Sequence, residues 1–324
     1  MGDYVLSVRA VRSGAFVADV GPSKFLVVPA DQSPAPAQAI TQAAWYKAVR
    51  AAAVWQNDRG EARGDVLFVV HGYNVSVDEA IARHRRLKGD LLALGFKGVV
   101  VSFDWPSDDN ALAYLPDRHR AKETAFRLVS DGIAYLSAEQ TPSCTINLHV
   151  LGHSTGAYVV REAFDDADDS ELPSAGWTVS QIIFAAGDVS AASMAAGDGD
   201  SESLYRHCVR LTNYASRYDQ ALDLSNVKRL GVSPRVGRIG LPGNAPPQAV
   251  NVDCTAYYAK LADDASGVAA EDQPNGFAGY QSHSWYFGNR TFTRDLFGVV
   301  IGEDRTVIPT RAVGPDGRIA LKKP

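Results

Sequence analysis

Short runs of apolar residues alternate along this chain with longer segments in which apolar residues recur every three or four positions. Continuous apolar runs are typical of strands buried on both faces of a parallel sheet, and the wider spacing is typical of amphipathic helices. The predicted strands are Val66–Val70, Val99–Phe103, Ile146–Leu151, Gln181–Ala186, Cys208–Tyr214 and Ala249–Cys254. Helical spacing is present over about 81–94 and 121–136 and from residue 157 onward. This alternation predicts an α/β fold with a doubly wound, mostly parallel sheet and helices on both faces.

The two ends of the chain carry weaker patterns. Tyr4–Ala10 and Phe25–Val28 predict two short strands around a turn at Gly21-Pro22. A stripe of apolar residues then predicts a helix over Ile40–Trp55. Near the other end, residues 291–324, which include the apolar run Leu296–Ile301, are expected to form a strand or hairpin against the body of the protein.

The chain has 324 residues and 46% hydrophobic content, which is enough to bury a large core. We expect a single domain over 1–324, in which residues 1–63 add strands and a helix to the sheet, 64–290 form the core and 291–324 form an extension. The interval between Asp188 and His207 is short and rich in Ala, Gly and Ser, which leaves little or no room for a lid domain.

A tight turn follows the strand Ile146–Leu151. Its sequence, Gly152-His153-Ser154-Thr155-Gly156, has the form G-x-S-x-G, and a helical pattern begins at once. A serine at such a strand-to-helix turn adopts a strained backbone conformation, and the two glycines let the strand and the helix approach each other. The strain exposes the hydroxyl at the carboxyl edge of the sheet, where the N–H of Thr155 can stabilise an oxyanion. We therefore predict that Ser154 is a nucleophile.

A serine nucleophile needs a general base, which a carboxylate holds in the correct tautomer. Only His207 and His283 follow Ser154 in the chain, and His207 precedes its apolar run, at the wrong end of a strand for this role. His283 is therefore the predicted base. Two acids stand just after predicted strands: Asp219, which we prefer, and Asp188, which is the alternative and also fits a turn or helix cap.

Other strand ends supply supporting candidates. Gly72 follows a strand and allows a sharp turn, so that the N–H of Tyr73 can form the second half of an oxyanion hole; the alternative is an ordinary glycine turn. Gly72 and Trp105 are also candidates for a substrate pocket, although an aromatic residue packed under a loop explains Trp105 nearly as well. His71 is interpreted as structural, and Asp104 receives no role.

Together these residues resemble the α/β-hydrolase superfamily. The likeness covers about residues 64–290 and rests on His71-Gly72-Tyr73-Asn74, Phe103-Asp104-Trp105-Pro106-Ser107, Gly152-His153-Ser154-Thr155-Gly156, Tyr218-Asp219-Gln220-Ala221-Leu222 and Gly279-Tyr280-Gln281-Ser282-His283-Ser284. Within the superfamily the sequence is similar to a bacterial family of uncharacterised, esterase-like hydrolases known as a domain of unknown function. The resemblance implies Ser154 as nucleophile, Asp219 as acid, His283 as base, and the N–H groups of Tyr73 and Thr155 as oxyanion donors.

The reaction expected of such a site is acyl transfer to water, which needs neither a metal nor an organic cofactor. Alkoxide and thiolate groups leave more easily than amines, so a small-molecule ester, thioester or lipid-like substrate is favoured. The alternative from another class is a binding or scaffold protein that keeps the hydrolase fold without turnover.

Charge and composition exclude several classes of protein. The formal net charge of −5 gives no electrostatic footprint for nucleic acid. No apolar run approaches the roughly 18 residues of a membrane span, and Met1-Gly2-Asp3-Tyr4 is not the start of a signal peptide. We therefore expect a soluble, cytoplasmic protein.

The cysteines and acidic stretches indicate no metal site. Cys144, Cys208 and Cys254 are widely spaced, with no C-x-x-C pair, and are interpreted as buried thiols. The acidic stretches 165–171 and 263–272 lack the spacing of an EF-hand loop and are interpreted as solvated loops.

Overall fold

The computed structural model describes residues 2–107, 114–138, 144–170, 172, 176–227, 233–268 and 281–324. Its strands are β1 (Asp3–Arg12), β2 (Ala15–Val28), β3 (Ala39–Ile40), β4 (Val54–Gln56), β5 (Ala62–Val70), β6 (Val99–Asp104), β7 (Cys144–His153), β8 (Val179–Ala185), β9 (Cys208–Ala215), β10 (Ala249–Asp253), β11 (Arg311–Val313) and β12 (Ile319–Leu321). Its helices are α1 (Gln42–Ala53), α2 (Val77–Ala93), α3 (Tyr114–Leu128), α4 (Ala134–Ala138), α5 (Thr155–Asp169), α6 (Gly199–Arg206), α7 (Gln220–Val227), α8 (Val236–Ile239), α9 (Thr255–Leu261), α11 (Gln281–Ser284) and α12 (Arg290–Val300).

The strands in the described part of the chain form one twelve-stranded sheet. Its order is β11-β12-β10-β9-β8-β7-β5-β6-β1-β2-β3, and β4 pairs with β5 outside this path. All neighbours from β12 to β1 in this order are parallel. The antiparallel pairs lie at the two edges and at β4. The predicted doubly wound, mostly parallel sheet is confirmed.

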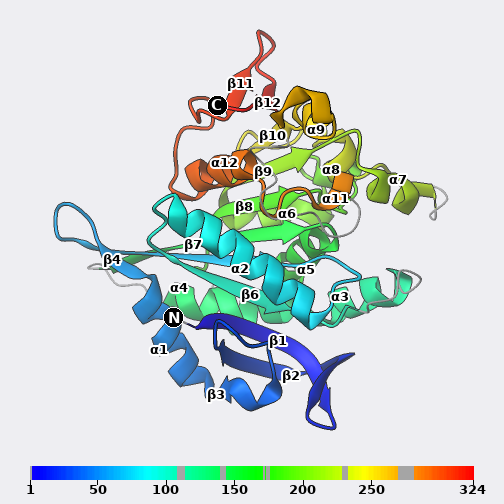
Figure 1. Cartoon of the computed structure of the whole chain (residues 1–324). Helices are drawn as coiled ribbons and strands as arrows, with labels where there is room; N and C mark the ends of the chain where they lie inside the picture. Colours follow the sequence, from blue (N-terminus) through cyan, green and yellow to red (C-terminus); the bar gives the residue numbers. More distant parts are fainter. Residues whose placement is uncertain are drawn as a thin grey trace.

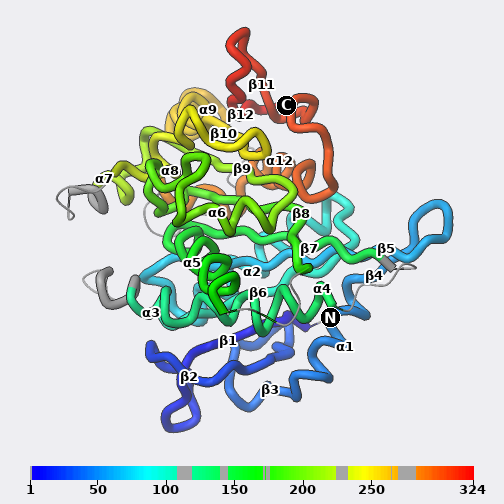
Figure 2. Tube along the Cα trace, turned by 180° about the vertical axis from the view of Figure 1, so that it is seen from behind, coloured from blue at the N-terminus to red at the C-terminus, as the bar shows by residue number. Residues whose placement is uncertain are grey.

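Helices cover both faces of this sheet, as views from opposite sides show (Figure 1 and Figure 2). The core on one face includes residues of α1, α3, α4, α5 and α6, and the core on the other includes residues of α2, α9 and α12. Successive residues of β5 alternate between the two: Val66, Phe68 and Val70 join the first core, and Leu67 and Val69 join the second. Because both faces of β5 are buried over these residues, successive residues must all be apolar. This explains the continuous apolar run from which the strand was predicted.

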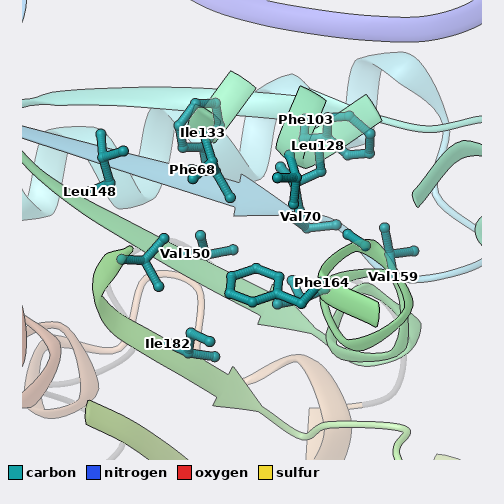
Figure 3. Close-up of a cluster of buried hydrophobic side chains, with 14 of the residues drawn as sticks. Phe68, Val70, Phe103, Leu128, Ile133, Leu148, Val150, Val159, Phe164 and Ile182 are labelled. Atoms are coloured by element: carbon teal, nitrogen blue, oxygen red, sulfur yellow. The ribbon is translucent and has the colours of Figure 1, made fainter. Parts of the chain in front are cut away.

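In the first core, helix α5 packs against the middle strands of the sheet. Figure 3 shows Phe68 and Val70 of β5, Val150 of β7 and Phe164 of α5 gathered in this layer. All four side chains are fully buried. Burying each such side chain contributes about 1.5–3 kcal/mol, which stabilises the packing of α5 against β5 and β7.

The N-terminal hairpin differs from the prediction in where it turns. Strands β1 and β2 pair around a turn at Ser13 and Gly14, both of which have positive φ. Gly21-Pro22 lies inside β2 instead, where the pairing with β1 is irregular and a Cβ on Gly21 would lie 2.4 Å from the Cα of Ala10. The prediction of a turn there was wrong because Gly and Pro also mark irregular strand pairing.

The C-terminal extension contains the predicted hairpin, formed by β11 and β12, but its apolar run Leu296–Ile301 belongs to helix α12 and its C-cap. Phe292, Leu296 and Val299, spaced three and four apart, face the core, and the Oδ1 of Asn289 caps the helix by accepting a bond from the N–H of Phe292 at 2.8 Å. Beyond it, β12 pairs in parallel with β10.

The interval between Asp188 and His207 contains α6, whose Leu204 and Tyr205 pack into the first core. This short helix therefore covers the sheet. Cys208 and Cys254 are buried free thiols, whereas the side chain of Cys144 lies outside the described residues.

Within the described residues, no helix is both long and apolar enough to cross a bilayer.

Candidate active site

Ser154 lies between the end of β7 and the start of α5, in the conformation φ 56°, ψ −125°. A positive φ is costly for a residue with a side chain and persists only where the surroundings enforce it. They do so here through two glycines. A Cβ on Gly152 would lie 2.7 Å from the backbone N of Ala157, and one on Gly156 would lie 2.2 Å from the carbonyl O of Val70. The steric reason for the G-x-S-x-G spacing is thus present in the structure.

The peptide unit between Ser154 and Thr155 is held from one side. The carbonyl O of Ser154 accepts bonds from the N–H of Ala157 at 3.0 Å and of Asp188 at 2.9 Å. In a trans peptide the N–H points opposite to the C=O, so the N–H of Thr155 points away from these two donors. It is the first N–H of α5, and the side chain of Ser154 does not cap the helix. The helix dipole adds partial positive charge at this point.

Asp219 and His283 form a buried pair. The Nδ1 of His283 lies 2.7 Å from Oδ2 of Asp219, which is fully buried. The other carboxylate oxygen of Asp219 accepts the N–H of Leu222 at 2.9 Å, so the same side chain caps α7. The N–H of Gln220 donates to Oγ of Ser282 at 3.2 Å, which joins the acid's loop to the histidine's loop. With its proton on Nδ1, the imidazole keeps Nε2 as a base.

His153 links the serine's strand to this histidine. Its Nε2 donates to the carbonyl O of His283 at 3.0 Å, and the two rings lie 5.0 Å apart between centroids. Burial, helped by nearby His283, holds the pKa of His153 well below its ordinary value, so the ring is neutral and carries one proton. Sequence reasoning assigned His153 no part in the site. The hydroxyl of Ser154 makes no hydrogen bond with a described residue, and the ring of His283 is bonded to Asp219.

The loop after β5 approaches Ser154 closely. A Cβ on Gly72 would lie 2.8 Å from the Cβ of Ser154 and 3.3 Å from its Oγ, so only glycine fits there. Trp105 is fully buried, and its indole N–H donates to the carbonyl O of His71 at 2.8 Å. Of the two interpretations of Trp105, packing under the loop fits this burial. The side chain fixes the turn that leads to Tyr73.

Asp104 and Arg9 contact the loop that follows β5 and hold it in place. Oδ1 of Asp104 lies 2.8 Å from Nε of Arg9 and 3.3 Å from Nε2 of His71. Burial acts to raise the pKa of Asp104, but Arg9 and His71 outweigh it and hold that pKa well below its usual range. The guanidinium also donates to the carbonyl O of Val75 at 3.2 Å and of Ser107 at 3.0 Å. No local pattern around Arg9 predicts this role, because its partners lie far along the chain.

Asp188, the alternative acid, has another partner. Its Oδ1 lies 2.9 Å from Nε of Arg235, and its Oδ2 accepts the hydroxyl of Thr155 at 3.5 Å. The structure thus brings Asp219, and not Asp188, to the imidazole of His283. No group of three or more His, Cys, Asp and Glu in the described residues could hold a metal ion; Glu171 and residues 269–272 of the two acidic stretches lie outside them.

Comparisons with known proteins agree with this fold. The model of the family described as an α/β-hydrolase of unknown function (DUF900) matches residues 48–247. No curated protein matches the sequence.

Several solved structures resemble the chain weakly. A protein described as a cell surface hydrolase from Lactobacillus plantarum is 12% identical, with 74% of this chain and 92% of that one covered and a TM-score of 0.35. A thioesterase of the prodiginine pathway from Streptomyces coelicolor is 12% identical, with coverages of 59% and 77% and a TM-score of 0.31. A lipase-esterase related protein from Clostridium acetobutylicum is 13% identical, with coverages of 64% and 92% and a TM-score of 0.32. At this level of similarity they assign no reaction to the chain.

Proposed function

The chain belongs to the DUF900 family of α/β-hydrolases, and from this premise we propose that it is a serine hydrolase that cleaves an ester or thioester through an acyl-enzyme on Ser154. The observation that carries the proposal is the strained serine turn, whose His153 contacts His283 of the buried pair Asp219–His283. A strained non-glycine residue and a buried acid–histidine pair are each costly to maintain, and a serine nucleophile on a strand-to-helix turn makes use of both.

In the acylation step, Asp219 keeps the histidine proton on Nδ1, so that Nε2 of His283 is free to act as base. As Oγ of Ser154 bonds to the substrate carbonyl carbon, Nε2 takes the hydroxyl proton and the carbonyl π electrons move onto oxygen. The N–H groups of Tyr73 and Thr155 donate to this oxyanion. When the carbonyl re-forms, the bond to the alkoxide or thiolate breaks, and the leaving group takes the proton from His283.

Deacylation repeats the route with water. Nε2 of His283 removes a proton from water as its oxygen attacks the acyl carbon, and the same two N–H groups receive the oxyanion. Collapse breaks the bond to Oγ, which regains its proton from the imidazolium, and a carboxylic acid is released.

The substrate class follows from leaving-group chemistry. Alkoxides and thiolates depart more easily than amines, so a small-molecule ester, thioester or lipid-like acyl donor suits this site.

The test is intact-mass labelling with a fluorophosphonate, which reacts with activated serines and hardly with ordinary ones. The wild type is compared with Ser154→Ala and His283→Ala, and with Ser266→Ala, which removes an exposed hydroxyl elsewhere. We expect one adduct on the wild type and on Ser266→Ala, and none on the other two variants.

Two results would contradict the proposal. If folded wild type acquires no adduct, the chain is better explained as a binding protein, for which ligand-dependent stabilisation without turnover is the expected behaviour. If Ser154→Ala is labelled as well as the wild type, the nucleophile lies elsewhere. Turnover of a chromogenic short-chain ester then distinguishes a true hydrolase from a serine that reacts only with the inhibitor.

A further inference from the structure

Next to the serine turn lies a buried ion pair that the mechanism above does not use. Asp188, which follows β8, and Arg235, which precedes α8, are each 1% exposed, and Nε of Arg235 lies 2.9 Å from Oδ1 of Asp188. Removing two charges from water is costly, and a buried ion pair is often no more stable than apolar residues of similar volume. The pair therefore calls for an explanation beyond stability.

Asp188 touches the peptide unit that supplies one proposed oxyanion donor. Its backbone N–H donates to the carbonyl O of Ser154 at 2.9 Å, which fixes the plane of the unit whose N–H belongs to Thr155. A carbonyl that accepts hydrogen bonds also makes the N–H of the same unit a better donor. The side chain reaches the same residue, because Oδ2 accepts the hydroxyl of Thr155 at 3.5 Å.

This position creates an electrostatic conflict. The N–H of Thr155 is proposed to receive a developing negative charge, and the carboxylate of Asp188, which contacts the hydroxyl of the same residue, places another negative charge nearby. In a site shielded from water, like charges at such a separation oppose each other strongly. An uncompensated carboxylate would therefore raise the energy of the oxyanion.

Arg235 is held in a way that suits charge cancellation. Its Nε lies within ion-pair distance of Asp188 but outside hydrogen-bond alignment, and its buried Nη2 has no hydrogen-bond partner among the described residues. The buried pair of Arg311 and Asp295 differs: Arg311 makes three aligned contacts to the carboxylate of Asp295, at 2.7 to 3.1 Å. Arg311 is thus bound by directional bonds, whereas Arg235 contributes chiefly its charge.

We propose that Arg235 is a positioning residue that cancels the charge of Asp188 and so keeps the oxyanion site receptive to negative charge, while Asp188 anchors the donor peptide through its backbone N–H. The inference rests on the proposed function. It predicts that the charge balance of the pair sets the rate of acyl transfer more than it sets substrate binding.

The experiment measures the rate of fluorophosphonate labelling and the kcat and KM for a p-nitrophenyl short-chain ester. Arg235→Met should slow labelling by about tenfold or more and lower kcat with little change in KM. The reason is that the charge of Asp188, once uncompensated, opposes the oxyanion that forms in the transition state. Arg235→Lys, which keeps the charge, and the double variant Arg235→Met/Asp188→Asn, which removes both charges, should stay within about threefold of the wild type.

Arg311→Met is the matched control, because it breaks a buried pair elsewhere. It should lower the melting temperature and leave the labelling rate within about threefold. A purely structural role for Arg235 would leave the double variant as slow as Arg235→Met, and that result, or an unchanged rate in Arg235→Met, overturns the proposal.

If Arg235→Met does not fold, the other two variants decide the matter. A loss of more than about tenfold in Arg235→Lys, or in a folded double variant, refutes charge cancellation. A wild type that acquires no adduct refutes the proposed function instead, so the two failures are distinguishable.

Discussion

Gly156→Ala tests the link between backbone packing and reactivity. The added Cβ would lie 2.2 Å from the carbonyl O of Val70 and 2.7 Å from that of His71. Non-bonded carbon–oxygen contacts are normally at least about 3.3 Å, so the start of α5 must move by about 1 Å. Both obstructing atoms belong to the backbone and cannot rotate away.

The two expected magnitudes follow from this displacement. Overpacking against a fixed backbone costs about 3 kcal/mol, and the better helix propensity of alanine offsets up to about 1 kcal/mol of it. The remaining 2 kcal/mol or so corresponds to a fall in melting temperature of roughly 3 °C for a chain of 324 residues. A shift of about 1 Å in the N–H of Thr155 should slow fluorophosphonate labelling by about 10²-fold.

Gly89→Ala is the matched control. Gly89 is an exposed residue inside α2, and a Cβ there meets nothing within 4 Å. The free energy of unfolding of this variant should be about 0.5–1 kcal/mol higher than that of the wild type, and it should be labelled at the wild-type rate. The assay is a thermal melt followed by a labelling time course on folded protein. A Gly156→Ala variant with wild-type melting temperature and labelling rate would refute the steric account of the turn.

Three further predictions concern charge and burial. Asp219→Asn should slow labelling by about 10⁴-fold without unfolding the protein, because Nδ1 of His283 loses its acceptor and the wrong tautomer forms; a mild effect would argue against Asp219 as the acid. The pKa of Asp104 is depressed in the folded protein, so its contribution to stability is present above the unfolded pKa of about 3.9 and is lost at lower pH. In urea unfolding, the free energy of unfolding of Asp104→Asn should therefore be about 3 kcal/mol lower than that of the wild type at pH 7, and this difference should become smaller below about pH 4. Burial raises the pKa of Cys208 to about 12 and that of Cys254 well above its ordinary value, so peptide mapping after iodoacetamide at pH 8 should find both unmodified until guanidinium unfolds the chain.

The middle of the sheet could be predicted from the sequence because burial on both faces leaves a strong pattern. Each residue of Val66–Val70 reaches one core or the other, and an unbroken apolar run is the direct result. The edges lack this constraint. Strands of three residues, such as β11 and β12, are too short to show a period, and an apolar run such as Leu296–Ile301 fits a helix as well as a strand.

The candidate site divides in a similar way. Ser154, Asp219 and His283 could be proposed because each stands in a local pattern that chemistry restricts, and the structure brings the last two into contact. Arg9 and Arg235 could not be proposed. They act through partners distant in the chain, and Arg9 in particular stands between apolar neighbours in an ordinary strand.

Strand β1 has a consequence for how this chain is made. Its Ser7 donates to Asp104 of β6, a partner 97 residues later. At a synthesis rate of about 5–20 residues per second, the hairpin leaves the ribosome roughly 5–20 s before the strand that completes it. During that interval the edge of β1 that later pairs with β6 can pair with another strand instead, and the guanidinium of Arg9 lacks its partner, the carboxylate of Asp104. Slowing translation before residue 104 should therefore promote misassembly of the nascent chain, a vulnerability that the finished sheet no longer has.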